Sequence, residues 1–254
     1  MKTCKPVATP MEIEEKLHIP DEHSNQVLNE NHRKIIGSLM YAMVGTRPDI
    51  SYALSSPSRF LENPTESQFK AVTRGLRYIR GTSRMQLRYD ENQSKEIEII
   101  GFSDSNWAND TIYRRSTTGY FISFLGGTIS WRSQRQKTVA LSSTEAEYIA
   151  LCSVNQVIIW LRSFLNEIGY NQINPSSIFA DNQGAIAIAK NTSHKSRTRH
   201  IDIKFHFIKE KVSNNEVEIK YIASESNSSD ILTKPTTKIV LLKHLEEIGL
   251  VVIN

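Results

Sequence analysis

The order of apolar patterns after residue 96 constrains the fold more than any other feature of the sequence. Three segments typical of β-strands come first, and Gly126-Gly127 turns the second into the third. Strand and helix patterns then alternate along the rest of the chain. The strand segments are 97–104, 118–124, 128–131, 177–180 and 217–222, and the helical ones are 142–169, 182–190, 201–214 and a start at Ser229. This order predicts an α/β fold, a mixed five-stranded sheet with helices on its faces.

The first 95 residues have a helical character instead. Residues 1–29 are polar, contain three prolines and are expected to form an extended arm. Helical patterns follow at 31–44, 48–61 and 65–80. The last of these opens with a capping box, Thr65 with Gln68, and the second should kink or end at Pro57, because an interior proline costs a helix about 3 kcal/mol. We predict two domains, 1–95 and 96–254, divided at the polar stretch 90–96.

Nothing in the sequence predicts a membrane span or a secretory signal. Apolar runs are short, such as the five residues Val157–Leu161, whereas a bilayer-spanning helix needs about 20, and no apolar stretch follows residues 1–5. The two cysteines, Cys4 and Cys152, are far apart in sequence and are expected to be thiols in a reducing compartment, with Cys152 a packing residue rather than a nucleophile. We expect a location in the cytoplasm or the nucleus.

Positive charge is concentrated in two blocks, although the net charge is only +4. Residues 59–88 contain seven basic side chains against two acidic ones, and residues 190–211 repeat these numbers, so each block carries a local +5. Such blocks suit a polyphosphate partner, because each neutralised phosphate releases counterions. The alternative is an ordinary solvated surface.

Three aspartates lie at the ends of predicted elements. Asp104 ends the first strand after residue 96, Asp181 follows the strand 177–180, and Asp230 lies in the first turn of a helix. Each position also has a structural explanation: Asp104 could form a turn, Asp181 could cap the next helix, and Asp230 could complement a helix dipole.

The helix that begins at Ser142 carries two candidate glutamates near its start, and helical phase separates them. Glu145 is three residues after Ser142 and can complete a capping box with it. Glu147 lies on the apolar stripe that must face the sheet. A buried unpaired charge costs several kcal/mol, so a carboxylate pointing inward is expected to have a cation as its partner.

These four carboxylates can converge at one edge of the sheet. Crowded carboxylates need a divalent cation for compensation, and oxygen ligands without a His or Cys cluster favour Mg²⁺ or Mn²⁺. Two such ions about 3.5 to 4 Å apart would activate a water and stabilise the leaving oxygen of a phosphoryl displacement. Together with the basic blocks, this pattern indicates phosphodiester hydrolysis.

Five motifs, in this order, closely resemble the ribonuclease H domain of copia-type LTR retrotransposon Pol polyproteins. They are Phe102-Ser-Asp-Ser-Asn-Trp-Ala108, Arg114-Arg-Ser-Thr-Thr-Gly-Tyr120, Ser142-Ser-Thr-Glu-Ala-Glu-Tyr148, Asp181-Asn-Gln-Gly-Ala-Ile186 and Asp230-Ile-Leu-Thr-Lys-Pro235. Residues 34–81 resemble the end of the family's reverse transcriptase, its thumb and connection region. The resemblance begins near residue 5 and implies a ribonuclease H-like fold preceded by a small, mostly helical segment.

The resemblance implies a function and a site. The metal-binding catalytic set would be Asp104, Glu147, Asp181 and Asp230, holding two Mg²⁺ ions, with Mn²⁺ as a substitute. The activity would be endonucleolytic cleavage of the RNA strand of an RNA/DNA hybrid, and the partners would be that hybrid and the rest of a Pol polyprotein. A Tyr-x-Asp-Asp polymerase motif does not occur in the sequence, so no polymerase activity is expected. The loop 223–227 also lacks the histidine that many relatives of the fold place before the last carboxylate.

Several residues are candidates for nucleic-acid contacts. They are Trp131, Arg132, Gln134, Arg135 and Lys137, then Arg197, Arg199 and His200, and finally Arg74 and Arg77. Trp131 could instead be a core residue, and His200 with His206 is a weaker metal-ligand alternative because their spacing suits one helical face poorly. Two rival functions stay open: a catalytically silent or co-opted nucleic-acid-binding remnant of a transposon, and an integrase-like transferase on the same fold class.

Overall fold

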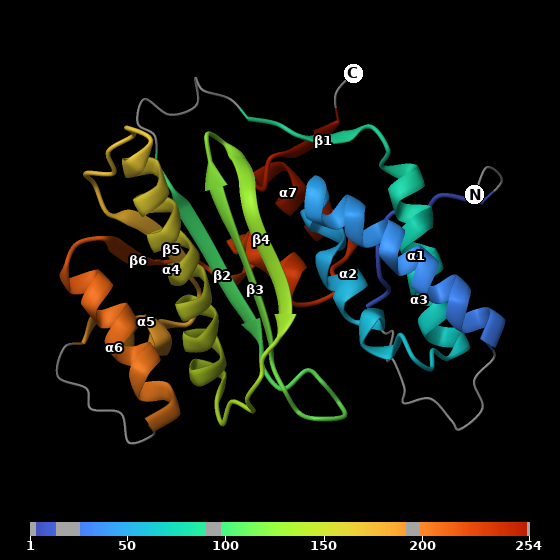
Figure 1. Cartoon of the computed structure of the whole chain (residues 1–254), viewed down its shortest axis with the longest axis horizontal. Coiled ribbons are helices and arrows are strands. Elements are labelled where there is room, and N and C mark those ends of the chain that lie inside the picture. The colour runs from blue at the N-terminus through green and yellow to red at the C-terminus, as the bar shows by residue number, and fades with distance from the viewer. Residues whose placement is uncertain (1–3, 14–25, 90–97, 192–198, 253–254) are drawn as a thin grey trace. The chain divides into compact units, whose positions relative to one another are not determined.

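The computed structural model describes residues 4–13, 26–89, 98–191 and 199–252 (Figure 1). Within helices, the side chains of residues 26–28 and 199–202 are outside the description. The chain forms two compact units: residues 1–87 with 234–254, and residues 88–233.

The first unit is mostly helical. Its elements are α1 (Gln26–Gly45), η1 (Pro48–Ile50), α2 (Ser51–Ser55), η2 (Pro57–Phe60), α3 (Glu66–Gly81), β1 (Met85–Leu87), α7 (Lys238–Glu247) and β7 (Leu250–Val252). The helix predicted over 48–61 ends at Ser55, and Pro57 begins a separate 3-10 turn, as the cost of an interior proline requires. The capping box of α3 is also confirmed, because Thr65 Oγ1 accepts from the backbone N–H of Gln68 while the Gln68 side chain accepts from the Thr65 N–H.

The last segment of the chain belongs to this first unit. Strand β7 pairs antiparallel with β1, with Gln86 opposite Val251, and thereby covers the edge of a three-residue strand. Residues 234–254 therefore lie outside the unit that holds the sheet, whereas the sequence grouped them with it in a 96–254 domain. The pairing joins residues far apart in sequence, so no local sequence pattern predicts it.

The second unit contains the predicted sheet, in the strand order β4-β3-β2-β5-β6. The strands are β2 (Ile100–Asn106), β3 (Thr117–Phe124), β4 (Gly127–Arg135), β5 (Ser176–Ala180) and β6 (Val217–Tyr221). Strands β2, β3 and β4 form an antiparallel meander, and β5 and β6 extend it in parallel, so the sheet is mixed. The predicted architecture, a mixed five-stranded sheet flanked by helices and preceded by a mostly helical segment, is confirmed.

Two details of the meander differ from the prediction. The turn between β3 and β4 consists of Leu125 and Gly126, both with positive φ, and Gly127 is already in β4 opposite Phe124. Strand β4 also continues to Arg135, beyond the predicted end at residue 131. In its second half, exposed polar side chains alternate with half-buried ones. This half therefore has no apolar run from which a strand could be predicted.

Helices α4 (Ser143–Glu167), α5 (Gln183–Lys190) and α6 (Arg199–Ser213) pack with the sheet around one apolar core (Figure 1). Ile158 of α4, Ile178 of β5 and Ile219 of β6 are fully buried there. Helix α4 is long and apolar enough to cross a membrane by length and composition, but 56% of its most apolar window is buried within the protein. This is the behaviour of a core helix, and α4 gives no clear membrane span.

Candidate metal centre

Asp104 is fixed in the middle of the sheet. It lies near the end of β2, paired with Gly119 of β3, and its side chain is buried. Thr233, which follows the 3-10 turn η4 (Ser228–Leu232), donates its hydroxyl to Asp104 Oδ2. Asp104 is thus a strand residue with an anchored carboxylate and not a turn former.

Asp181 comes directly after β5, which runs parallel to β2. Because parallel strands end at the same edge of a sheet, the two aspartates come to one side. The residue that caps α5 is Asn182, whose Oδ1 accepts from Ala185 N–H at 2.9 Å. Asp181 is therefore not the cap, and its Oδ2 accepts instead from Ser224 Oγ at 2.5 Å.

Glu147 comes from the first turns of α4. The helix is capped by Ser142, whose Oγ accepts from Glu145 N–H at 3.1 Å, while Glu145 Oε2 accepts from the Leu141 N–H at 2.8 Å. Glu145 thus has the capping role expected of it, although its backbone partner is Leu141 and not Ser142. Glu147 points inward as helical phase predicts and is only 5% exposed. Its Oε1 accepts from both the N–H and the hydroxyl of Ser105, each at 3.0 Å.

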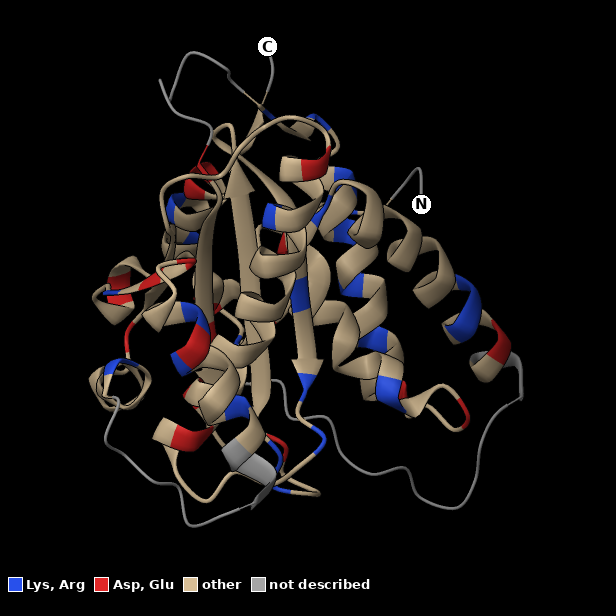
Figure 2. Ribbon diagram, turned by 60° about the vertical axis from the view of Figure 1, so that its left-hand side comes forward, with Lys and Arg blue, Asp and Glu red and all other residues tan. Residues whose placement is uncertain are grey.

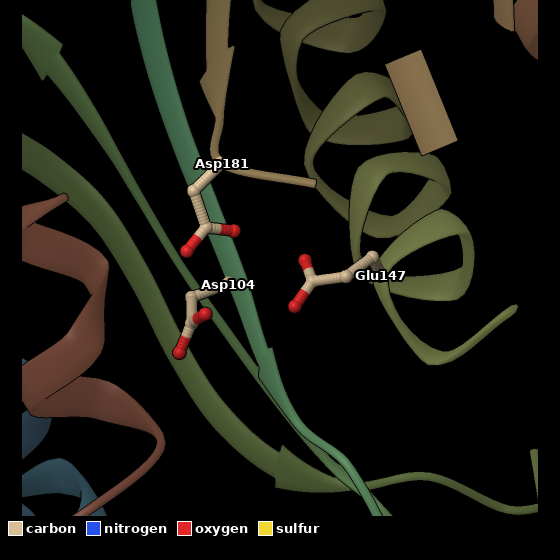
Figure 3. A group of neighbouring side chains, drawn as sticks. All are labelled: Asp104, Glu147 and Asp181. Carbon is tan, nitrogen blue, oxygen red and sulfur yellow. The ribbon is translucent and has the colours of Figure 1, made fainter. Parts of the chain in front are cut away.

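The three carboxylates form one cluster. One oxygen from each of Asp104, Glu147 and Asp181 lies within 4.8 Å of the other two, and Figure 3 shows the three side chains as neighbours, with the Glu147 carboxylate reaching from its helix toward the two aspartates. Burial, together with the negative charges of Asp104 and Asp181, raises the pKa of Glu147 to about 9, against the opposing effect of the Ser105 hydrogen bonds. Without a cation, this arrangement of charges is unfavourable.

The cluster fits a hard divalent cation. Glu147 Oε2 is buried and has no hydrogen-bond partner among the described residues, so one oxygen of a clustered carboxylate lacks a donor. All three side chains offer carboxylate oxygens, the ligands preferred by Mg²⁺ and Mn²⁺, and no His or Cys belongs to the group.

Asp230 lies apart from this group of three. It is in η4, which is a five-residue 3-10 turn rather than the start of a longer helix, and it is 7% exposed. The same turn is bound to β2, because Asn227 Nδ2 donates to the Ser103 carbonyl at 2.9 Å. A role for Asp230 as a fourth ligand stays a prediction.

The candidate nucleic-acid residues in β4 and just after it have different environments. Arg132, Gln134 and Lys137 are exposed, and Trp131 is half-buried. Arg135 forms an ion pair with the buried Asp110, with 2.6 Å between Nη1 and Oδ2. The hydrogen bond to Arg135 helps to keep the pKa of Asp110 low although burial raises it, so Arg135 has a structural partner within the chain.

The other basic candidates lie elsewhere. On α3, Arg74 binds Glu12 and Thr9, and Arg77 Nε donates to the Lys5 carbonyl at 2.8 Å, so both contact the N-terminal segment (Figure 2 shows Lys and Arg along the helices of this unit). Arg197 lies outside the described residues. Arg199 and His200 begin α6, but their side chains are outside the description.

Sequence reasoning missed the hydroxyl groups around the cluster. The Ser105 hydroxyl binds Glu147, that of Thr233 binds Asp104 and that of Ser224 binds Asp181, so each carboxylate accepts from one hydroxyl. Ser105 and Thr233 are within the motifs quoted above, but a hydroxyl in a motif does not reveal which distant carboxylate it meets.

The chain is similar to parts of large transposon proteins. It is 41% identical over 252 residues to the Retrovirus-related Pol polyprotein from transposon TNT 1-94 of Nicotiana tabacum, covering 96% of this chain and 19% of that protein. It is 35% identical over 253 residues to the corresponding polyprotein from transposon RE2 of Arabidopsis thaliana, covering 99% and 17%. The chain thus spans less than a fifth of the length of these relatives.

Among solved structures, LC11-RNase H1 from compost superposes with a TM-score of 0.41 and 18% identity, covering 54% of this chain and 92% of that one. No protein-family model matches the chain. Identity of 35% and more over almost all of its residues, together with the ordered motifs, settles the family. The chain belongs to the retrovirus-related Pol polyproteins of plant copia-type transposons.

Proposed function

We propose that this chain is a metal-dependent ribonuclease H that hydrolyses the RNA strand of RNA/DNA hybrids within a copia-type Pol polyprotein. The observation that carries the proposal is the buried cluster of Asp104, Glu147 and Asp181, in which one oxygen of Glu147 has no donor among the described residues. The family of the chain supports the same activity, because its relatives are Pol polyproteins of transposons.

Asp104, Glu147 and Asp181 would hold Mg²⁺, with Mn²⁺ as a substitute and Asp230 as a further ligand. Two bound ions would supply activation of a water and stabilisation of the leaving oxygen in an in-line displacement at phosphorus. The chain's own contribution is to fix the ligands: Asp104 and Asp181 lie on rigid strand ends, and Glu147 is held by Ser105. The exposed Arg132, Gln134 and Lys137 would bind the phosphates of the hybrid.

The test is cleavage of a hybrid carrying a labelled RNA strand, in Mg²⁺, by the full chain and by two matched variants. Glu147→Gln removes a carboxylate from the cluster but keeps its shape. Glu145→Gln makes the same chemical change two residues away, at the helix cap. We expect Glu147→Gln to lose at least about 100-fold in rate, because a direct ligand should matter no less than the outer partners of a metal site, and Glu145→Gln to stay within about threefold.

Equal activity of the wild type and Glu147→Gln would remove Glu147 from the site. A folded wild type that binds the hybrid without cutting it would refute the nuclease and favour the silent or co-opted binding module. Strand transfer between DNA ends in place of RNA cleavage would favour the integrase-like function. The same assay run with Asp230→Asn decides whether that residue belongs to the site.

A further inference from the structure

Gly119 is the point where the 3-10 turn η4 meets the sheet. It lies opposite Asp104 in the β2–β3 pairing. A Cβ at position 119 would come within 2.5 Å of Thr233 Cγ2 and 2.9 Å of Leu232 Cβ, so only a glycine allows this approach. The motif that contains Gly119 supplies no carboxylate to the cluster, yet its glycine is the cross-strand neighbour of Asp104.

Because η4 packs closely against Gly119, Thr233 comes within hydrogen-bonding distance of the Asp104 carboxylate. It is fully buried, and its hydroxyl oxygen contacts both Asp104 Oδ2 and, at 3.1 Å, the carbonyl of Asp230. A hydroxyl has a single hydrogen, and Asp104 Oδ2 is the nearer of the two acceptors. The Thr233 carbonyl in turn accepts from Asn106 Nδ2 at 3.3 Å, at the end of the strand that carries Asp104.

We propose that Thr233 is a positioning residue of the metal centre, and that Gly119 is required because a side chain at this position would push Thr233 away from Asp104. The hydroxyl fixes Asp104 through Oδ2, so that this carboxylate is oriented before any cation arrives. Hydrogen bonds to metal-binding carboxylates commonly set ligand orientation and affinity in this way. The inference rests on the proposed function in that it assigns Asp104 to a cation site, and it adds two residues to that site.

The experiment measures Mn²⁺ binding to the full chain, by the electron paramagnetic resonance signal of free Mn²⁺, in parallel with hybrid cleavage. Thr233→Val replaces the hydroxyl with a methyl of similar size, and Thr233→Ser keeps the hydroxyl. Thr73→Val is the matched control, since the Thr73 hydroxyl donates to the Phe69 carbonyl of its own helix in the other unit. Gly119→Ala displaces Thr233 without changing its chemistry.

We expect the Kd for Mn²⁺ to rise about 10- to 100-fold in Thr233→Val and in Gly119→Ala, and to change less than about threefold in Thr233→Ser and Thr73→Val. Circular dichroism confirms folding before each titration. If Thr233→Val does not fold, Thr233→Ala, which adds no atoms, is judged by the same criterion.

Unchanged Mn²⁺ affinity in a folded Thr233→Val or Thr233→Ala overturns the inference, and so does an equal loss in Thr233→Ser. The proposed function fails separately. A wild type that binds Mn²⁺ but does not cut the hybrid refutes the nuclease while the affinity comparison still decides the role of Thr233. A wild type that binds no Mn²⁺ refutes both.

Discussion

Replacing Glu147 with glutamine should stabilise the metal-free protein. Glu147 is 5% exposed and shares its site with two aspartates, so its negative charge is costly in the folded state. Glutamine has nearly the same shape and no charge. The substitution that removes a proposed cation ligand is therefore expected to increase the free energy of unfolding when no cation is present.

The magnitude follows from the pKa of Glu147, which is raised from 4.5 to about 9. The folded-state pKa lies above the unfolded one, so the Glu147 carboxyl group lowers the free energy of unfolding as the pH rises. This loss of stability is absent below about pH 4.5, grows by roughly 1.4 kcal/mol per pH unit, and is complete near pH 9. Replacing Glu147 with glutamine should therefore increase the free energy of unfolding by at most about 4 kcal/mol at pH 7.5, and by at most about 1 kcal/mol at pH 5.5.

The assay is urea unfolding in EDTA at these two pH values, followed by tryptophan fluorescence. All three tryptophans, Trp107, Trp131 and Trp160, lie in the unit of residues 88–233, so their emission reports on the unit that holds the cluster. Glu145→Gln is the control, because its carboxylate is at the helix cap and outside the cluster. Adding Mg²⁺ should increase the free energy of unfolding of the wild type but not that of Glu147→Gln. The difference in stability between the two proteins should therefore become smaller in Mg²⁺ than in EDTA.

The reasoning is refuted if the wild type is as stable as Glu147→Gln at pH 7.5 in EDTA. It is refuted equally if the difference between the two proteins is the same at pH 5.5 and pH 7.5. Either result would mean that Glu147 is not buried among like charges.

Three further predictions concern single residues. Asn182→Ala removes the cap of α5 and should cost about 1 kcal/mol in urea unfolding, with hybrid cleavage retained. Arg132→Ala should weaken binding of the hybrid, measured by fluorescence anisotropy at several salt concentrations. The slope of log K against log salt concentration should become shallower by about one, and an unchanged slope would exclude a phosphate contact. Burial raises the pKa of Cys152 to about 11, whereas a hydrogen bond from Arg80 lowers the pKa of Cys4, so Ellman's reagent at pH 8 should label Cys4 quickly and Cys152 only after unfolding.

Local rules account for what the sequence predicted well. The break at Pro57, the cap at Thr65 and the inward phase of Glu147 each depend on residues a few positions apart, within one helix or turn. The order of strands and helices follows in the same way from apolar periodicity, and it already places Asp104 and Asp181 at strand ends. The convergence of three carboxylates could therefore be expected before any coordinates.

The rest depends on contacts between distant parts of the chain. Thr233 meets Asp104 across 129 positions, and Ser224 meets Asp181 across 43, so neither hydroxyl could be assigned to a carboxylate from its neighbours. The pairing of β7 with β1 likewise joins residues more than 160 positions apart, such as Gln86 and Val251. The sequence offered Asp181 as a possible cap of α5, but the side chain that accepts from the Ala185 N–H is that of the next residue, Asn182.

The most direct test of the cation site is a crystal structure of the full chain grown with Mn²⁺ and recorded with anomalous scattering. We expect one or two anomalous peaks within about 2.0 to 2.4 Å of carboxylate oxygens of Asp104, Glu147 and Asp181. Saturating Mn²⁺ with no peak among these three side chains would contradict the account.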